Sequence, residues 1–167
     1  DWYLVTSSPY FYPTDKFLLS HIDSEINWEL LSLQGNQKAW SNEELIIAVA
    51  KKESIKKQIN WKAISSLKEF PITKKVLSVI PIDAINWTYI SSRKSIVPYI
   101  DEFVDYIDWK VISNSQHINS LEIGFLDKYK EYIDWNIICK KSDFKFNNEI
   151  LYLFEDYIDW NLASNSK

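Results

Sequence analysis

Hydrophobic and polar positions recur along this chain in a pattern centred on tryptophan. The pattern begins with an aliphatic residue, then Asp or Asn, then Trp. Two variable residues, an aliphatic residue and a small polar residue follow, as in INWKAIS, IDWKVIS and IDWNIIC. We call this pattern the Trp motif. Seven of the eight tryptophans lie in register, at separations of 26, 33, 26, 22, 26 and 25 residues: Trp2, Trp28, Trp61, Trp87, Trp109, Trp135 and Trp160. A period of about 20 to 50 residues is typical of repeat architectures.

Each Trp motif predicts a short helix. Asp or Asn before Trp is a favourable N-cap, because its side-chain oxygen accepts amide hydrogens of the first helical turn. In the last three copies the predicted caps are Asp108, Asp134 and Asp159. Trp then occupies the first helical position, and the aliphatic residue three places on shares its face. The small polar residue that follows suits the end of a helix of about two turns.

The segment before each Trp motif predicts a second, longer helix. Apolar residues there follow steps of three and four, which define an amphipathic helix of about three turns. Before the last motif these residues are Ile150, Leu151, Phe154 and Ile158. Predicted start signals of such helices are Ser41 (with Glu44 in a capping-box pattern), Ser120, Asn147 and the first-turn residue Pro98.

Two segments interrupt the regular pattern. About seven extra residues, Gln34–Trp40, lie in the second repeat, and we expect them to form a loop that protrudes from one edge. Pro81 interrupts the third repeat, so the helix before it should stop or kink near Val79.

Neither predicted helix can bury its apolar face alone, so neighbouring repeats must stack. The chain is therefore predicted to be all-α: an α-solenoid of about six two-helix repeats of roughly 22–33 residues, in a single array over residues 1–167. Two glycines in the whole sequence also favour helices over a strand-rich fold, which uses Gly in its turns. The chain lacks Met and begins and ends inside a motif, so we expect it to be a piece of a longer protein.

The motif resembles the Trp-anchored tandem repeats of giant DNA viruses and some bacterial proteins, which read approximately Ile-Asn/Asp-Trp-x-x-Leu-Ser. The segments INWKAISS, IDWKVISN and IDWNLASN carry the resemblance, which covers nearly the whole chain. It implies a helical array used for interaction and supplies no catalytic residues.

The residues that could perform chemistry are few and scattered. The two histidines, His21 and His117, lie in different repeats, and a metal site needs several converging ligands. Cys139 occupies a position where other motifs carry Ser or Thr, which favours a small buried side chain over a nucleophile with its own base. The capping aspartates should line up one per repeat and not converge on a substrate. We therefore expect no enzyme, no metal and no cofactor.

Charge is distributed unevenly along the sequence. Residues 51–75 hold eight lysines against two glutamates, a net +6, whereas the whole chain carries −4. One interpretation is an anion-binding patch with Trp40 nearby as a stacking or anchor residue, through Lys51, Lys52, Lys56 and Lys57. The other interpretation is a solvated helix face, which the acidic pI near 5.2 favours.

These features predict a non-enzymatic scaffold that binds a protein or peptide. Two alternatives stay open: sequence-independent nucleic-acid binding through the Lys51–Lys75 segment, and a recognition module of a larger enzyme. A single cysteine, the absence of an apolar run of about 18 residues and the lack of a signal-peptide pattern predict a cytoplasmic protein without a membrane partner.

Overall fold

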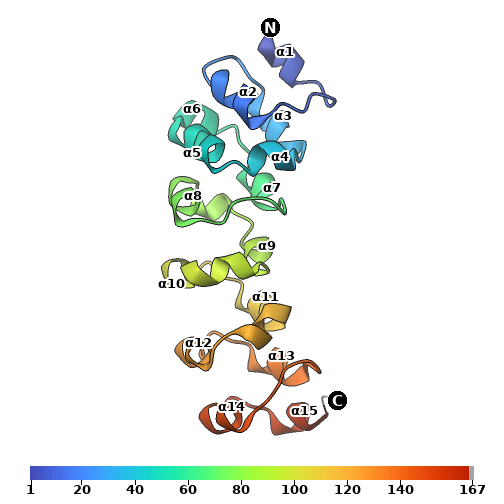
Figure 1. The fold of residues 1–167 in the computed structure, drawn as a ribbon, viewed down its shortest axis with the longest axis vertical. Helices are drawn as coiled ribbons and strands as arrows, with labels where there is room; N and C mark the ends of the chain where they lie inside the picture. Colours follow the sequence, from blue (N-terminus) through green and yellow to red (C-terminus); the bar gives the residue numbers. More distant parts are fainter. Residues whose placement is uncertain (166–167) are drawn as a thin grey trace. The chain divides into compact units, whose positions relative to one another are not determined.

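The computed structural model describes residues 1–165, and every regular element in this range is a helix (Figure 1), which confirms the all-α prediction. Seven motif helices each begin at the Trp of a motif: α1 (Trp2–Thr6), α3 (Trp28–Leu33), α7 (Trp61–Ser65), α9 (Trp87–Ser91), α11 (Trp109–Asn114), α13 (Trp135–Lys140) and α15 (Trp160–Asn165). The connecting helices are α2 (Asp15–Ser20), α4 (Gln37–Trp40), α5 (Glu43–Lys51), α6 (Glu53–Lys56), α8 (Lys74–Val79), α10 (Ile100–Phe103), α12 (Ile123–Lys128) and α14 (Asn148–Leu153). Three 3₁₀ helices complete the set: η1 (Ile82–Ala84), η2 (Lys94–Tyr99) and η3 (Gln116–Ser120).

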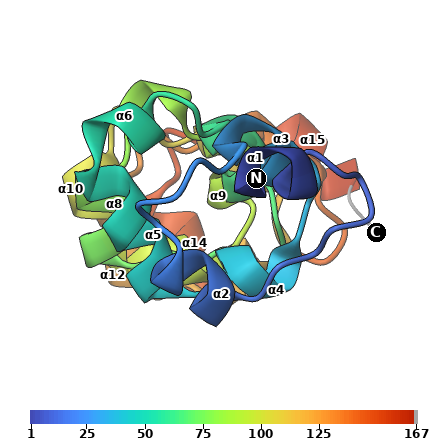
Figure 2. The ribbon, with the colours of Figure 1, turned by 90° about the horizontal axis from the view of Figure 1, so that it is seen from above.

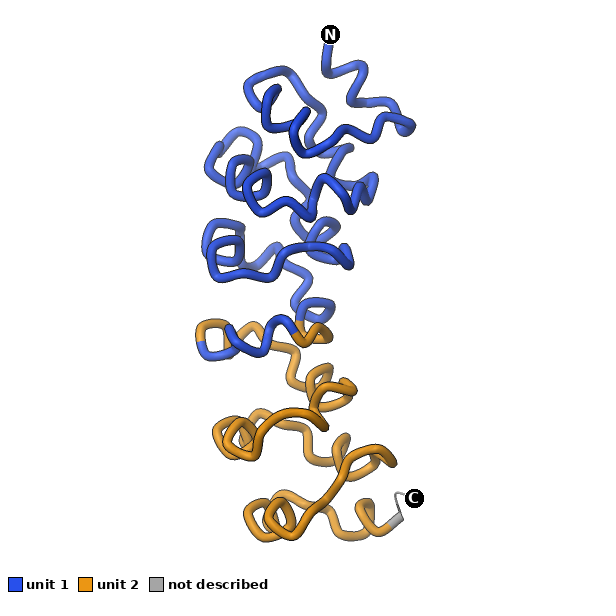
Figure 3. Tube along the Cα trace, viewed as in Figure 1, with its two compact units in different colours: residues 1–90, 95–101 blue, residues 91–94, 102–167 orange. Residues whose placement is uncertain are grey.

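Contacts within the chain divide it into two compact units (Figure 3). Unit 1 comprises residues 1–90 and 95–101, and unit 2 comprises residues 91–94 and the chain from 102 onward. In unit 1, α1 packs on α3 and α3 on α7, while α2 packs on α5 and α5 on α8. In unit 1, α5, α6 and α8 lie on the side away from α3 and α7, and α4 lies beside α3 (Figures 1 and 2). In unit 2, α11 packs on α13 and α13 on α15.

The predicted N-caps of the motif helices are confirmed. In unit 1, the side chains of Asn27 and Asn60 accept the N–H groups of Leu30 and Ala63 at 3.0 and 2.9 Å. In unit 2 the three aspartates do the same: Asp108 accepts from Val111 at 3.2 Å, Asp134 from Ile137 at 3.2 Å, and Asp159 from Leu162 at 3.1 Å. Each cap satisfies one of the amides that a helix start leaves without an intrahelical partner.

The small polar residue of the motif has a role that differs from the predicted one. It does not simply end a helix, because its buried oxygen accepts the backbone N–H of the N-cap residue in the next motif. Five such bonds, each 2.9 Å long, occur within residues 1–165: Asn27 to Thr6, Asn60 to Ser32, Asn86 to Ser65, Asp108 to Ser91 and Asp134 to Ser113. All five acceptor residues are buried. We call this contact the motif-to-motif bond.

The motif tryptophan links the helix that it starts to the segment that precedes it. The indole Nε1–H of Trp61 donates to the Lys56 carbonyl at 2.9 Å, and that of Trp135 donates to the Lys130 carbonyl at 2.9 Å. Trp87 and Trp109 make the same bond to the carbonyl five residues earlier. For Trp61, Trp109 and Trp135 the acceptor carbonyl lies at or just after the end of the preceding helix, whereas the acceptor of Trp87 is Ile82, the first residue of η1.

The connecting helix before the last motif is shorter than the one predicted. α14 ends at Leu153, although the apolar pattern continues to Ile158. Phe154 and Ile158 are still buried, but they lie in the turns between α14 and α15. The predicted length of three helical turns was wrong for α14. Apolar spacing reports which residues are buried, and the non-helical segment after α14 buries residues at similar intervals.

The predicted start and stop signals have mixed outcomes. Asn147 caps α14, and α8 ends at Val79 before Pro81, as predicted. The Ser41 prediction was wrong, because Asn42 caps α5 and Ser41 closes the preceding α4. Ser120 lies in η3 and not at the start of α12, and Pro98 lies near the end of η2 and not in a first turn. The predicted protruding loop is also corrected, since its second half forms α4.

Candidate functional site

The four lysines of the predicted anion-binding patch lie at the end of α5 and around α6. Lys51 and Lys57 are exposed, whereas Lys52 and Lys56 are partly covered. Lys52 pairs with Asp23, and Lys57 pairs with Glu53 at 3.8 Å. Carboxylates of unit 1 therefore neutralise part of this group, and only Lys51 and Lys56 of the four make no ion pair within residues 1–165.

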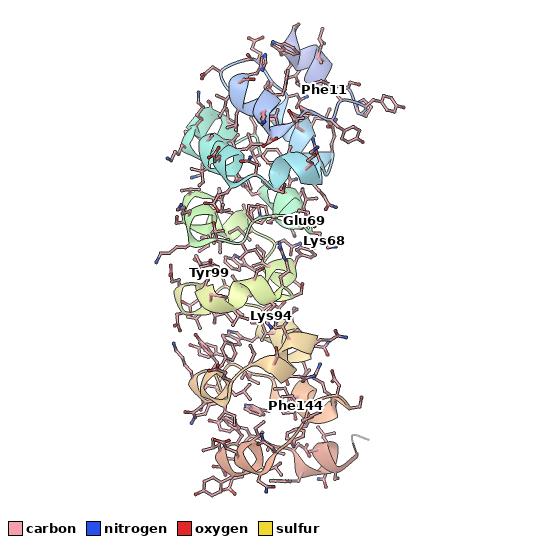
Figure 4. All side chains as sticks on the ribbon, viewed as in Figure 1. Phe11, Lys68, Glu69, Lys94, Tyr99 and Phe144 are labelled. Carbon is pink, nitrogen blue, oxygen red and sulfur yellow. The ribbon has the colours of Figure 1, made fainter. Side chains whose placement is uncertain are left out.

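The remaining lysines of the 51–75 segment do not extend this group into one surface. Lys62 is on α7, and Lys68 lies in the loop after it, on the α7 side of unit 1 (Figure 4). α5 and α6 lie on the other side of the same unit (Figure 1). Lys75, in α8, is 4.0 Å from Glu43. The net charge of +6 is thus distributed over two sides of unit 1.

Trp40 was predicted to be a stacking or anchor residue, and the structure places it in the core instead. Its side chain is fully buried, and its Nε1–H donates to the Leu31 carbonyl at 3.2 Å. A fully buried indole has no face available for a base or a partner side chain. The prediction failed because α4 folds the inserted segment back against α2 and α5, which gives Trp40 a place in the interior.

Unit 2 has an open cleft of about 640 Å³ between two successive Trp motifs. It is lined by residues 107–110 and 132–136. We call it the 109–132 cleft. Trp109 and Tyr132 stack within it, with ring centroids 5.0 Å apart and an interplanar angle of 29°. Trp109 is half-buried and Tyr132 is 48% exposed, so the pair presents aromatic surface to solvent.

Sequence reasoning missed this cleft, although the signal was present in the motif. Tyr precedes Ile-Asp-Trp in unit 2, at Tyr106, Tyr132 and Tyr157. The corresponding residues of unit 1 are Glu25, Gln58 and Ala84. Tyr132 stacks on the Trp of the preceding motif, and Tyr157 contacts Trp135 in a tilted arrangement with ring centroids 5.8 Å apart. The tyrosine of YIDW therefore covers the neighbouring motif's indole.

Carboxylates surround the aromatic residues of unit 2. Asp108 and Asp134 both line the 109–132 cleft, together with one cation, Lys110. At the next motif, Tyr157 donates its hydroxyl hydrogen to Glu131. This hydrogen bond to Glu131, with nearby Asp156 and Asp127, raises the pKa of the Tyr157 hydroxyl. Negative charge therefore lies beside the tyrosines at two successive motifs.

The histidines and the cysteine do not come together. His21 closes α2 in unit 1, whereas His117 lies in η3 and Cys139 in α13 of unit 2. Burial, followed by the positive charges of Lys94 and Lys141, lowers the pKa of His117. His117 borders a cleft of about 510 Å³, and its Nε2 is buried without a hydrogen-bond partner in the described residues.

Cys139 occupies the serine position of the motif-to-motif bond. Burial raises the pKa of its thiol, and this effect outweighs the N–H of Asp159, which lowers it. A thiol held neutral in the core is a poor nucleophile, because the thiolate is the reactive form. No group of three His, Cys, Asp or Glu side chains within residues 1–165 is arranged to hold a metal ion.

None of the helices within residues 1–165 has the length and apolar character needed to cross a membrane. No protein-family model, curated protein or solved structure matches this chain.

Proposed function

We propose that this chain is an α-solenoid of Trp-anchored repeats that serves as a non-enzymatic scaffold for a protein or peptide partner. The observation that carries the proposal is the repeated motif-to-motif bond, with the same 2.9 Å geometry at five successive joints. This bond assigns a role in the fold to two positions of the motif, the cap and the small polar residue, and the indole bond assigns one to the Trp. The variable residues remain available for surface recognition.

Exposed apolar side chains near the motifs support this proposal. In unit 2 they are Tyr106, Tyr132, Tyr152, Leu153 and Trp160. Aromatic residues are enriched at the centre of protein interfaces, because they bury a large area at a small cost in conformational entropy. Stacked helical repeats commonly present such residues over an extended surface.

The test is selection of ligands by the purified chain. A phage-displayed library of random peptides is panned on it, and the enriched sequences are synthesised with a fluorescent label and titrated by anisotropy. We expect dissociation constants below about 100 μM, with scrambled peptides at least tenfold weaker. If no enriched peptide binds more tightly than its scrambled version, a role in peptide or protein binding is contradicted.

Nucleic-acid binding by the Lys51–Lys75 segment is the competing proposal. It is favoured by Lys51, Lys56, Lys62 and Lys68, which make no ion pair within the described part of the chain. Anisotropy with labelled single- and double-stranded oligonucleotides at about 50 to 300 mM salt tests it, because phosphate contacts give a steep salt dependence. The test variant replaces Lys51, Lys52, Lys56 and Lys57 with Glu. Salt-sensitive binding that this variant loses would favour nucleic acid over a protein partner.

A further inference from the structure

The 109–132 cleft of unit 2 combines an aromatic surface with carboxylates in a way that selects one kind of ligand. Trp109 is held in place by its Nε1–H, which donates to the Val104 carbonyl at 3.2 Å, and by Tyr129, whose ring centroid lies 5.1 Å away. Tyr132 covers it at 5.0 Å. The Trp109 indole is therefore positioned before any ligand arrives, which reduces the entropic cost of binding to it.

The polar groups of the cleft can accept hydrogen bonds from a ligand. Asp134 uses Oδ1 to cap Ile137, and its second carboxylate oxygen makes no hydrogen bond within residues 1–165. The Tyr132 hydroxyl is likewise without a partner there. Asp108 adds a second carboxylate to the lining, and Lys110 is the one cation among the lining residues, which all belong to the described part of unit 2. The cleft thus offers more negative than positive charge.

The charge of unit 2 has the same sign as that of its cleft. Its sequence holds 12 Asp and Glu residues against 9 Lys and Arg residues, a net −3. A negative surface of this kind attracts cations over a distance and raises the rate of association with a basic partner. The same net negative charge disfavours phosphate-bearing ligands.

We propose that the 109–132 cleft binds an arginine side chain of a basic peptide segment, an inference that rests on the scaffold function proposed above. The guanidinium stacks on the Tyr132 and Trp109 rings and donates hydrogen bonds to the Asp134 carboxylate. A planar, delocalised cation suits both contacts, because it stacks on aromatic faces and pairs with a carboxylate through two N–H groups. Lys110 opposes the ligand's charge and limits its affinity.

The experiment uses a fluorescein-labelled peptide of alternating Gly and Arg, titrated with the whole chain at about 50 and 300 mM salt. The matched control peptide carries citrulline at each Arg position, which preserves the shape and removes the charge. We expect the citrulline peptide to bind at least about tenfold more weakly, because it keeps the stacking surface but loses the cation–π and charge-assisted contacts.

Unit 1 suggests variants that preserve the fold. Asp134→Asn keeps the N-cap, because Asn60 caps α7 in the same way, and Tyr132→Gln copies Gln58 at the matching position. Each should weaken binding of the Arg peptide about fivefold or more, whereas Lys110→Ala should strengthen it. The control is Glu122→Gln, which removes one exposed charge from unit 2 outside the cleft and should change affinity by less than about twofold. Circular dichroism of each variant establishes that it is folded.

The outcomes separate this inference from the scaffold proposal. If Asp134→Asn and Glu122→Gln weaken binding of the Arg peptide equally, the peptide is attracted by the charge of unit 2 as a whole. That result would overturn the cleft as the binding site. Absence of Arg-peptide binding at low salt would also overturn it. If the random library still yields specific peptides in that case, the scaffold proposal stands with a different surface.

Discussion

Replacing Ser113 by Ala removes one motif-to-motif bond, and the structure allows its cost to be worked out. The Ser113 side chain is fully buried; its Oγ accepts the Asp134 N–H at 2.9 Å and donates to the Trp109 carbonyl at 2.7 Å. The Trp109 carbonyl keeps its backbone hydrogen bond within α11, so losing the bond from the Ser113 hydroxyl costs it little. The Asp134 N–H is left buried without an acceptor, which costs about 1–3 kcal/mol. We expect the free energy of unfolding to fall by that amount.

The assay is urea unfolding of the whole chain, followed by far-ultraviolet circular dichroism. Ser120→Ala is the matched control, because the Ser120 hydroxyl donates to a carbonyl at 2.8 Å in unit 2 but accepts no N–H from another motif. It should change stability by less than about 0.5 kcal/mol. Ser113→Cys should fall between the two, since a thiol is a weak acceptor and Cys139 already occupies this position in α13. A Ser113→Ala loss no larger than that of Ser120→Ala would refute the reasoning.

Three further predictions concern single side chains. Trp61→Ala should cost about 3–5 kcal/mol in urea unfolding, because the residue is 3% exposed, whereas Trp160→Ala should cost less than about 1.5 kcal/mol, because Trp160 is 53% exposed. An equal cost at both positions would contradict the burial assigned to them. Cys139 should react with a thiol reagent at pH 8 at least about a hundredfold more slowly in the native chain than in urea, because its thiol is buried and its pKa is raised. Because the folded-state pKa of His117 is lowered from 6.5, its neutral form favours folding, so the stabilisation is present above pH 6.5 and is lost as pH falls through the folded-state pKa. A His117→Gln variant should therefore show a shallower loss of melting temperature between pH 7 and pH 5, and an unchanged slope would count against this assignment.

The repeat and its caps could be predicted from the sequence because they depend on local chemistry. An Asn or Asp before Trp caps a helix regardless of what packs above it, and Asn60 and Asp134 do so in separate units. The stop before Pro81 is equally local, since proline restricts the residue before it. These features required no knowledge of which segments meet in space.

The predictions that failed depended on long-range packing. The burial of Trp40 follows from where α4 packs, and a single inserted segment gives no sign of that position. The serine of the motif meets its N–H partner about 20 residues along the chain, so its acceptor role appears only after the motifs are stacked. The stacking of Tyr132 on Trp109 has the same origin, although the three YIDW copies could have suggested it.

Hydrogen exchange of individual amides, measured by nuclear magnetic resonance, tests the central claim that the first six Trp motifs are joined by the same hydrogen bond. The amides to follow are those of the N-cap residues, which donate the motif-to-motif bonds: Asn27, Asn60, Asn86, Asp108 and Asp134. An N-cap amide lies outside its helix ladder, so protection there reports the bond to the neighbouring motif. We predict that all five exchange at least about a hundredfold more slowly than in the unfolded chain. Unprotected N-cap amides beside protected helix amides would contradict the joint and the scaffold built on it.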